Sequence, residues 1–144
     1  MQDSDFEILA ELGSGTFASV YKGREKSSSK EVALKKIFWN SSPSRIASEL
    51  SALMDLRGQP GIVQIRGGYR QGDIVTLVTD YQRHQNLRDI IWDMDMDHIK
   101  SYMRQLLIAT RSVHEKGLIH RDIKPGNFLY DLYQDIGELC DFGL

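Results

Sequence analysis

Five short runs with β-strand character crowd the first 81 residues, and this order constrains the fold more than any other feature of the chain. Each run is rich in β-branched, aromatic or aliphatic residues and is bounded by turn residues. The expected strands are Phe6–Leu12, Ser19–Arg24, Glu31–Ile37, Ile62–Tyr69 and Ile74–Tyr81. Helical patterns dominate the rest of the chain. A strand-rich first part followed by a helical second part predicts an α+β fold.

Two longer segments have helical periodicity. The first follows Ser42, which can cap a helix, and Pro43, which suits a first helical position. The second is expected to run from about Asp97, as its cap, to Lys116, with Gly117 ending it. Its buried stripe is expected to be Ile99, Met103, Leu106, Leu107, Thr110 and Val113. Two short strands are expected later, at Phe128–Tyr130 and Glu138–Cys140.

The overall composition excludes several classes of protein. Of the 144 residues, 41% are hydrophobic and 26% are charged, so the chain can build a core. A net charge of −2 gives no reason to expect a nucleic-acid or membrane partner. The single cysteine, Cys140, excludes an internal disulfide and suits a reducing compartment. The acidic start is no secretory signal, and no membrane span is apparent. We therefore expect an intracellular protein.

A glycine-rich segment lies between the first two expected strands. Glycine lets the backbone approach a ligand closely, and backbone N–H groups can then face phosphate oxygens. A plain hairpin turn would also explain two nearby glycines. The segment is Gly13, Ser14, Gly15, Thr16, Phe17, Ala18, Ser19 and Val20.

A lysine at the end of the third strand has a candidate partner on the first helix. Glu49 lies three residues after Ile46 and four before Leu53, so it borders the apolar stripe of that helix. A carboxylate placed there needs a cation, because an unpaired buried charge is costly. Lys35 is the candidate, and the pair would hold its ammonium towards phosphate groups. The alternative is that Glu49 simply reaches water.

The strongest signal for chemistry is the segment His120–Asn127. Asp122 can accept the proton of a substrate hydroxyl, and Asn127 can offer its carbonyl oxygen to Mg²⁺. Lys124 lies between them and can neutralise charge on a phosphoryl group. His120 is expected to have a structural role. The segment predicts phosphoryl transfer.

The tripeptide Asp141-Phe142-Gly143 supplies a second acidic candidate for Mg²⁺. A match of three residues means nothing alone, but here it follows the Asp122–Asn127 segment at a short distance. Asp141 is therefore expected to bind metal.

The order and spacing of these four sites resemble the eukaryotic protein kinase family, from about Phe6 to Leu144. The resemblance implies an N-terminal lobe of antiparallel sheet plus helix within about 1–81. It implies that about 82–144 hold the hinge, the start of a helical C-terminal lobe, the catalytic loop and the Asp-Phe-Gly motif. ATP and Mg²⁺ would be the cofactors and protein hydroxyls the substrate, and Lys124 implies serine/threonine specificity.

The resemblance also implies roles for individual residues. Thr79 would stand behind the adenine, and Asp80-Tyr81-Gln82 would form the hinge that hydrogen-bonds it. Asp122 and Lys124 would be catalytic, and Asn127 and Asp141 would bind the metal. Besides the glycine-rich segment, the nucleotide-binding residues would be Leu12, Ala33, Lys35, Glu49, Asp80, Tyr81 and Leu129.

Shorter stretches suggest a subfamily. Gly13–Tyr21, Ser101-Tyr102-Met103 and Pro125–Tyr130 are similar to the cell-division-cycle kinase that fires replication origins. That similarity implies a role in cell division and DNA replication, a nuclear location and a separate activating subunit. Asn127-Phe128-Leu129 also occurs in casein kinase one, which is the alternative subfamily.

The chain ends at Leu144, one residue past Asp-Phe-Gly, so the kinase domain expected over 1–144 is incomplete. In the family, an activation loop and large helices come next and hold the peptide substrate. Without them, the Asp97–Lys116 helix is expected to leave part of its apolar stripe exposed. The alternative function is therefore a non-catalytic nucleotide-binding or interaction module of kinase ancestry.

Three further residues have structural interpretations. Trp39 and Trp92 are expected to be partly buried packing residues. Cys140 is expected to face the nucleotide pocket as a small hydrophobic residue, without a reactive or metal-binding role.

Overall fold

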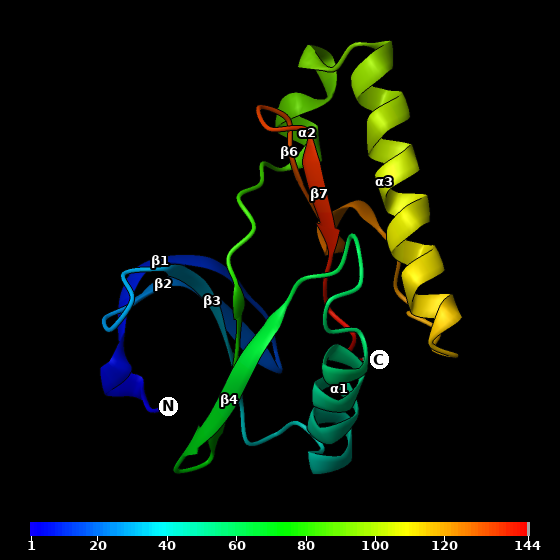
Figure 1. Ribbon diagram of the computed structural model, residues 1–144. Coiled ribbons are helices and arrows are strands. Elements are labelled where there is room, and N and C mark those ends of the chain that lie inside the picture. Colours follow the sequence, from blue (N-terminus) through cyan, green and yellow to red (C-terminus); the bar gives the residue numbers. More distant parts are fainter. Residues whose placement is uncertain (144) are drawn as a thin grey trace.

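The computed structural model describes residues 1–143, whose first half forms a five-stranded sheet (Figure 1). Every neighbouring pair of strands in the sheet is antiparallel. Across the sheet the strands are ordered β1 (Phe6–Ser14), β2 (Ala18–Glu25), β3 (Glu31–Ile37), β5 (Ile74–Asp80) and β4 (Ile65–Gln71). Together with the helices described next, this sheet confirms the predicted α+β fold class.

The remaining elements form two groups: α1, and the elements that follow the sheet in the chain. Helix α1 (Pro43–Asp55) connects β3 to β4. Figure 1 shows the second group, which consists of α2, α3 and a ribbon of two strands. An extended segment after β5 connects this group to the five-stranded sheet. These elements are α2 (Leu87–Ile90), α3 (Met96–Glu115), β6 (Phe128–Asp131) and β7 (Ile136–Leu139). Short 3₁₀ turns occupy Asp3–Asp5, Ile91–Asp93 and Pro125–Asn127.

One hydrophobic core joins the sheet and α1 to α3 and the β6–β7 ribbon. Leu53 and Leu56 contribute from the α1 side, and Tyr102 and Val113 contribute from α3. The Tyr102 ring packs edge-on against the rings of Phe128 and Tyr130, each 5.0 Å away between centroids. Such edge-to-face aromatic pairs stabilise a core beyond the area they bury. The shared core fixes the sheet, α1 and the β6–β7 ribbon relative to one another.

The strand expected at Ile62–Tyr69 begins later, at Ile65. Gly61 and Val63 instead exchange backbone hydrogen bonds with Leu139 of β7, at 2.7 and 3.1 Å. Gly61 has a φ of +75°, and a Cβ there would lie 2.9 Å from that of Ala109 on α3. The segment is therefore held between β7 and α3, and its apolar residues pack there instead of continuing β4.

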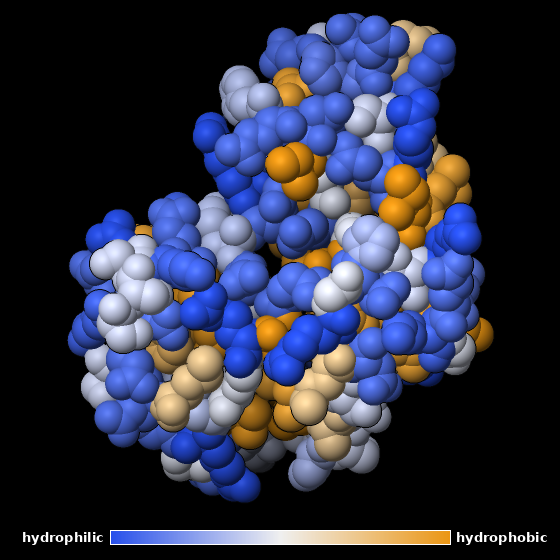
Figure 2. All heavy atoms as spheres, in the orientation of Figure 1, coloured by the Kyte–Doolittle hydropathy of each residue, from blue (hydrophilic) through white to orange (hydrophobic). Residues whose placement is uncertain are grey.

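The predicted buried face of α3 was partly wrong. Tyr102, Ala109 and Val113 are buried, whereas Leu107 is 65% exposed. The β6–β7 ribbon packs against the row that contains Tyr102, and that contact decides which apolar row turns inward. Hydrophobic atoms accordingly reach the surface over α3 in Figure 2. The exposed apolar residues of α3 are Met96, Ile99, Met103, Leu107 and Ile108.

Three smaller expectations were also wrong. Trp39 and Trp92 are 80% and 92% exposed: Trp39 lies in the connector between β3 and α1, and Trp92 lies in the short 3₁₀ turn Ile91–Asp93. The N-terminal cap of α3 is Asp95, whose carboxylate accepts the N–H of His98 at 2.9 Å, so Asp97 lies inside the first turn. Ser42 does precede α1, but its hydroxyl bonds to that of Ser44 instead of capping the helix.

Candidate active site

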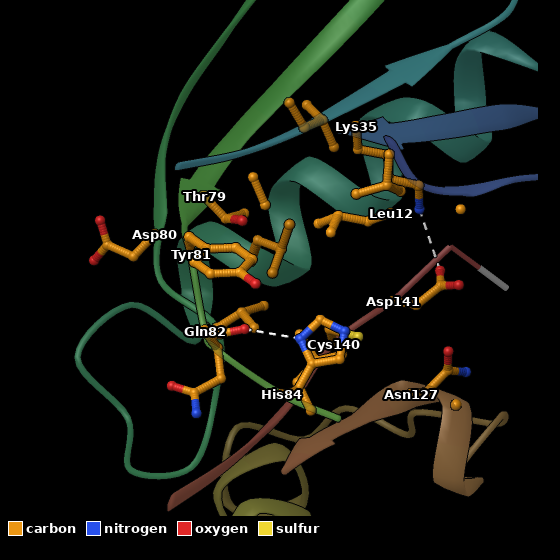
Figure 3. A pocket seen from close by; sticks show the side chains of 18 of the residues that line it. Leu12, Lys35, Thr79, Asp80, Tyr81, Gln82, His84, Asn127, Cys140 and Asp141 are labelled. Atoms are coloured by element: carbon orange, nitrogen blue, oxygen red, sulfur yellow. Dashed lines mark hydrogen bonds and ion pairs between the residues drawn. The ribbon is translucent and has the colours of Figure 1, made fainter. Parts of the chain in front are cut away.

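A cavity of about 240 Å³ opens between the sheet, the segment after β5 and the β6–β7 ribbon (Figure 3). It continues into a second cavity of about 530 Å³ under the glycine-rich segment, because Lys35, Glu49 and Asp141 line both. Most residues expected to bind a nucleotide line this cleft. In the first cavity they are Leu12, Gly13, Val20, Ala33, Lys35, Glu49, Asp80, Tyr81, Asn127, Leu129 and Asp141. In the second they include Ser14, Gly15, Thr16, Phe17, Ala18 and Asp122.

Three of the expected residues do not point into the cleft. Ser19 is buried, and its hydroxyl lies 2.8 Å from that of Ser14. Lys124 lines neither cavity, although it lies beside Asp122. In Figure 3 the Asp80 side chain points away from the pocket, and its carboxylate instead pairs with Arg66 at 3.1 Å. Only backbone atoms of Asp80 are thus available to a ligand in the pocket.

The glycine-rich segment forms the turn of the β1–β2 hairpin. The Gly15 N–H donates to the Ala18 carbonyl at 2.9 Å and closes the turn. A Cβ added at Gly13 would meet nothing within 4 Å, so space for a ligand lies beside the backbone there. Ala18 is not among the residues with positive φ, so alanine fits this turn without backbone strain.

Lys35 stands between two carboxylates. Its Nζ lies 2.6 Å from Glu49 Oε1 and 3.2 Å from Asp141 Oδ1. Burial disfavours the charged ammonium, but the two carboxylates outweigh burial and raise the pKa of Lys35. Glu49 is only 5% exposed, so it does not reach water as the alternative interpretation supposed. The ammonium is therefore held as a fixed positive charge in the cleft.

Asp122, Lys124 and Asn127 come together in one turn of backbone after α3. The Asn127 side-chain amide donates to the Asp122 carbonyl at 2.9 Å and to its carboxylate at 3.0 Å. Lys124 Nζ lies 3.2 Å from the same carboxylate. The amide nitrogen of Asn127 thus faces Asp122, which leaves its carbonyl oxygen free of these bonds.

His120 ties this turn to the strand end that carries Asp141. The backbone N–H of Asp122 donates to Nδ1 of His120 at 3.1 Å, so the ring's proton lies on Nε2 and is donated to the Cys140 carbonyl at 2.8 Å. The ring also packs edge-on against Phe142, 4.8 Å between centroids. Arg121 and Asp141 adopt positive φ angles of 72° and 63°. Backbone strain of this kind gathers at functional sites.

His84 and Arg45 are among the residues of the cleft that the sequence did not predict. His84 lines the first cavity, and its Nδ1 lies 2.8 Å from the carbonyl oxygen of Gln82 (Figure 3). Arg45, on the first turn of α1, lines the second cavity. Neither belongs to a motif, and no periodicity distinguishes them. Thr79 and Cys140 line the first cavity as expected.

The donor chemistry fits a nucleotide with Mg²⁺. Within residues 1–143 no three His, Cys, Asp or Glu side chains gather as a complete metal cage. Mg²⁺ usually takes one or two carboxylates and completes its shell with waters and phosphate oxygens. Asp141 and the free carbonyl oxygen of Asn127 are a donor set of that size. A fixed cation, two oxygen donors and a hydrogen-bonded aspartate in one cleft suit phosphoryl transfer.

The fold and the site are those of a protein kinase. The family description that matches is the protein kinase domain, over residues 6–144. The chain therefore belongs to the protein kinase family.

The relatives narrow the class. "Probable cell division control protein 7 homolog 2" of Encephalitozoon cuniculi is 40% identical over 94% of this chain and 39% of its own length. The mouse "Cell division cycle 7-related protein kinase" is 34% identical over 96% of the chain and 25% of its own length. "Cell cycle protein kinase spo4" of Schizosaccharomyces pombe is 33% identical over 99% of the chain and 39% of its own length. The resemblance to cell-division-cycle kinases is confirmed.

The chain spans between a quarter and two fifths of the length of these relatives. Among the helices of residues 1–143, none is both long and apolar enough to cross a lipid bilayer.

Proposed function

We propose that this chain is the nucleotide-binding and phosphoryl-transfer part of a serine/threonine protein kinase. Residues 1–81 form the N-terminal lobe in this proposal. Residues 82–144 hold the hinge, the start of the C-terminal lobe, the catalytic loop and the Asp-Phe-Gly motif. The reaction transfers the γ-phosphoryl group of ATP to a protein hydroxyl. The observation that carries the proposal is the contact of Lys35 with both Glu49 and Asp141, opposite a turn that joins Asp122 to Asn127.

Each of these groups has a defined task in the proposal. Lys35 binds phosphate oxygens, and Glu49 keeps its ammonium in place. Asp122 orients the substrate hydroxyl and accepts its proton, while Lys124 compensates negative charge beside it. Asp141 and Asn127 hold Mg²⁺, which when bound neutralises charge on the phosphates. Catalysis then consists mainly of positioning and charge stabilisation.

The names of the relatives support a cellular role in division control, and we extend that role to this chain. By the same family relationship we propose initiation of DNA replication as the process and the nucleus as the location. A protein substrate and a separate activating subunit are the proposed partners. The casein-kinase-one alternative has no support among the relatives described above.

The first experiment tests nucleotide binding by titration calorimetry with Mg·ATP. Lys35→Met should weaken binding at least about tenfold, because it removes charge-assisted hydrogen bonds. Lys36→Met is the matched control. Lys36 follows directly in β3 but turns to the other face of the strand, where its Nζ pairs with Asp3 at 3.1 Å. Equal losses in both variants, or no ATP binding by the wild type, would contradict the proposal.

The second experiment measures transfer of labelled phosphate to a generic protein substrate. Asp122→Asn should lower the rate by about 10²- to 10⁴-fold and leave ATP affinity nearly unchanged, because the amide cannot accept the proton. Transfer that survives this change would exclude the assigned role. Tight ATP binding without any transfer would favour the non-catalytic module.

A further inference from the structure

The tip of the glycine-rich loop is fastened to the connector between β3 and α1. The Asn40 side-chain amide donates to the Thr16 carbonyl at 3.0 Å. The neighbouring Phe17 carbonyl accepts the Phe38 N–H at 2.9 Å and the Ser41 hydroxyl at 3.3 Å. The connector therefore holds two successive carbonyl groups at the turn of the hairpin.

These bonds orient the loop's other peptide groups. The C=O and N–H of a trans peptide point in opposite directions, so fixing the Thr16 carbonyl towards Asn40 turns the Phe17 N–H away from the connector. Fixing the Phe17 carbonyl does the same for the Ala18 N–H. Backbone N–H groups are the part of such a loop that can contact phosphate oxygens. Their direction thus depends on side chains outside the loop.

The same connector leads into α1, the helix that carries Glu49, the partner of Lys35. Arg45, two residues into α1, places its guanidinium 5.8 Å from the centroid of the Phe17 ring. One turn further along α1, Glu49 binds Lys35 at 2.6 Å. Residues 38–49 therefore contact the tip of the glycine-rich loop and the Lys35 ammonium. Both of these border the cavity of about 530 Å³.

We propose that Asn40 is a positioning residue for the phosphate groups of the nucleotide, acting through the Thr16 carbonyl. This inference rests on the proposed function, because it takes the cleft to be the ATP site. Asn40 is exposed and lies in a connector between elements, so its replacement leaves the core intact. Replacing Asn40 with a residue that lacks the side-chain amide removes its hydrogen bond to the loop.

The test compares ATP with adenosine, which lacks phosphates. Asn40→Ala and Asn40→Leu should each weaken Mg·ATP binding about fivefold and change adenosine binding less than about twofold, because one hydrogen bond is lost at the phosphate end. Alanine and leucine differ in volume, so equal losses identify the hydrogen bond. Trp39→Ala is the control: it is the adjacent exposed residue, and its affinities should match the wild type. Equal weakening of both ligands, or unchanged ATP binding, would overturn the proposal.

Hydrogen exchange of the nucleotide-free protein provides a second measurement. The Asn40 variants should exchange the amides of residues 13–18 about fivefold faster than the wild type, whereas Trp39→Ala should not. Unchanged exchange would overturn the restraint itself. A wild type that binds no nucleotide would refute the proposed function, while the exchange rates would still decide whether Asn40 restrains the loop.

Discussion

Glu138 gives the sharpest prediction about stability. It lies on β7 opposite Leu129, only partly exposed, and has no salt bridge with any described residue. Burial, with a smaller contribution from the negative charge of Asp80, raises the pKa of Glu138 from 4.5 to about 7. The native protein therefore holds a proton that the unfolded chain releases between these two values. The contribution of Glu138 to the free energy of unfolding therefore falls as the pH rises from 4.5 towards 7.

The size of the effect follows from the two pKa values. A difference of 2.5 corresponds to about 3 kcal/mol at pH 8, as an upper limit. Because solvent reaches part of the side chain, about 2 kcal/mol is the expected cost. At pH 5 the carboxyl is mostly protonated in the native protein, and the cost is below about 1 kcal/mol.

Glu138→Gln removes the titration and keeps the shape. The free energy of unfolding of the variant minus that of the wild type should be about 1–2 kcal/mol larger at pH 8 than at pH 5. Urea unfolding at both pH values measures this difference. Comparing the two pH values cancels any constant cost of burying the amide. Glu115→Gln is the control, because Glu115 is 54% exposed and pairs only with Arg111 on the same helix. The same difference at pH 5 and pH 8 for Glu138→Gln would refute the reasoning.

Two further predictions concern the β6–β7 ribbon and the residue that follows it. Burial and the neighbouring Asp141 raise the pKa of Cys140 to about 12, so iodoacetamide at pH 8 should label native protein far more slowly than urea-unfolded protein, as mass spectrometry can measure. Rapid labelling of the native thiol would contradict this. Gly137→Ala should destabilise the protein by about 1–3 kcal/mol, since an added Cβ would overlap the ring of Phe128, and thermal unfolding would detect it. An unchanged melting temperature would mean that the ring moves aside easily.

The turn that joins Asp122 to Asn127 illustrates what the sequence determines by itself. Asp122 and Asn127 are five residues apart, and a turn of that length brings their side chains within 3.0 Å. The strands before residue 81 are similarly local, because a period of two and bounding turn residues fix their extent to within a few residues. Residue types within such segments carry their own chemistry, which is why the sequence alone could suggest candidate residues for phosphoryl transfer.

The tertiary structure decided the contacts between distant segments. Lys35 and Asp141 are 106 residues apart, and their 3.2 Å contact exists only because one core joins α1 to the β6–β7 ribbon. Packing also chose which apolar row of α3 faces inward, since both rows have the same helical period. Asn40 could not be found from sequence, because its importance lies in one hydrogen bond to a backbone carbonyl. Local pattern thus determines the elements and their chemistry, whereas long-range packing determines which groups meet.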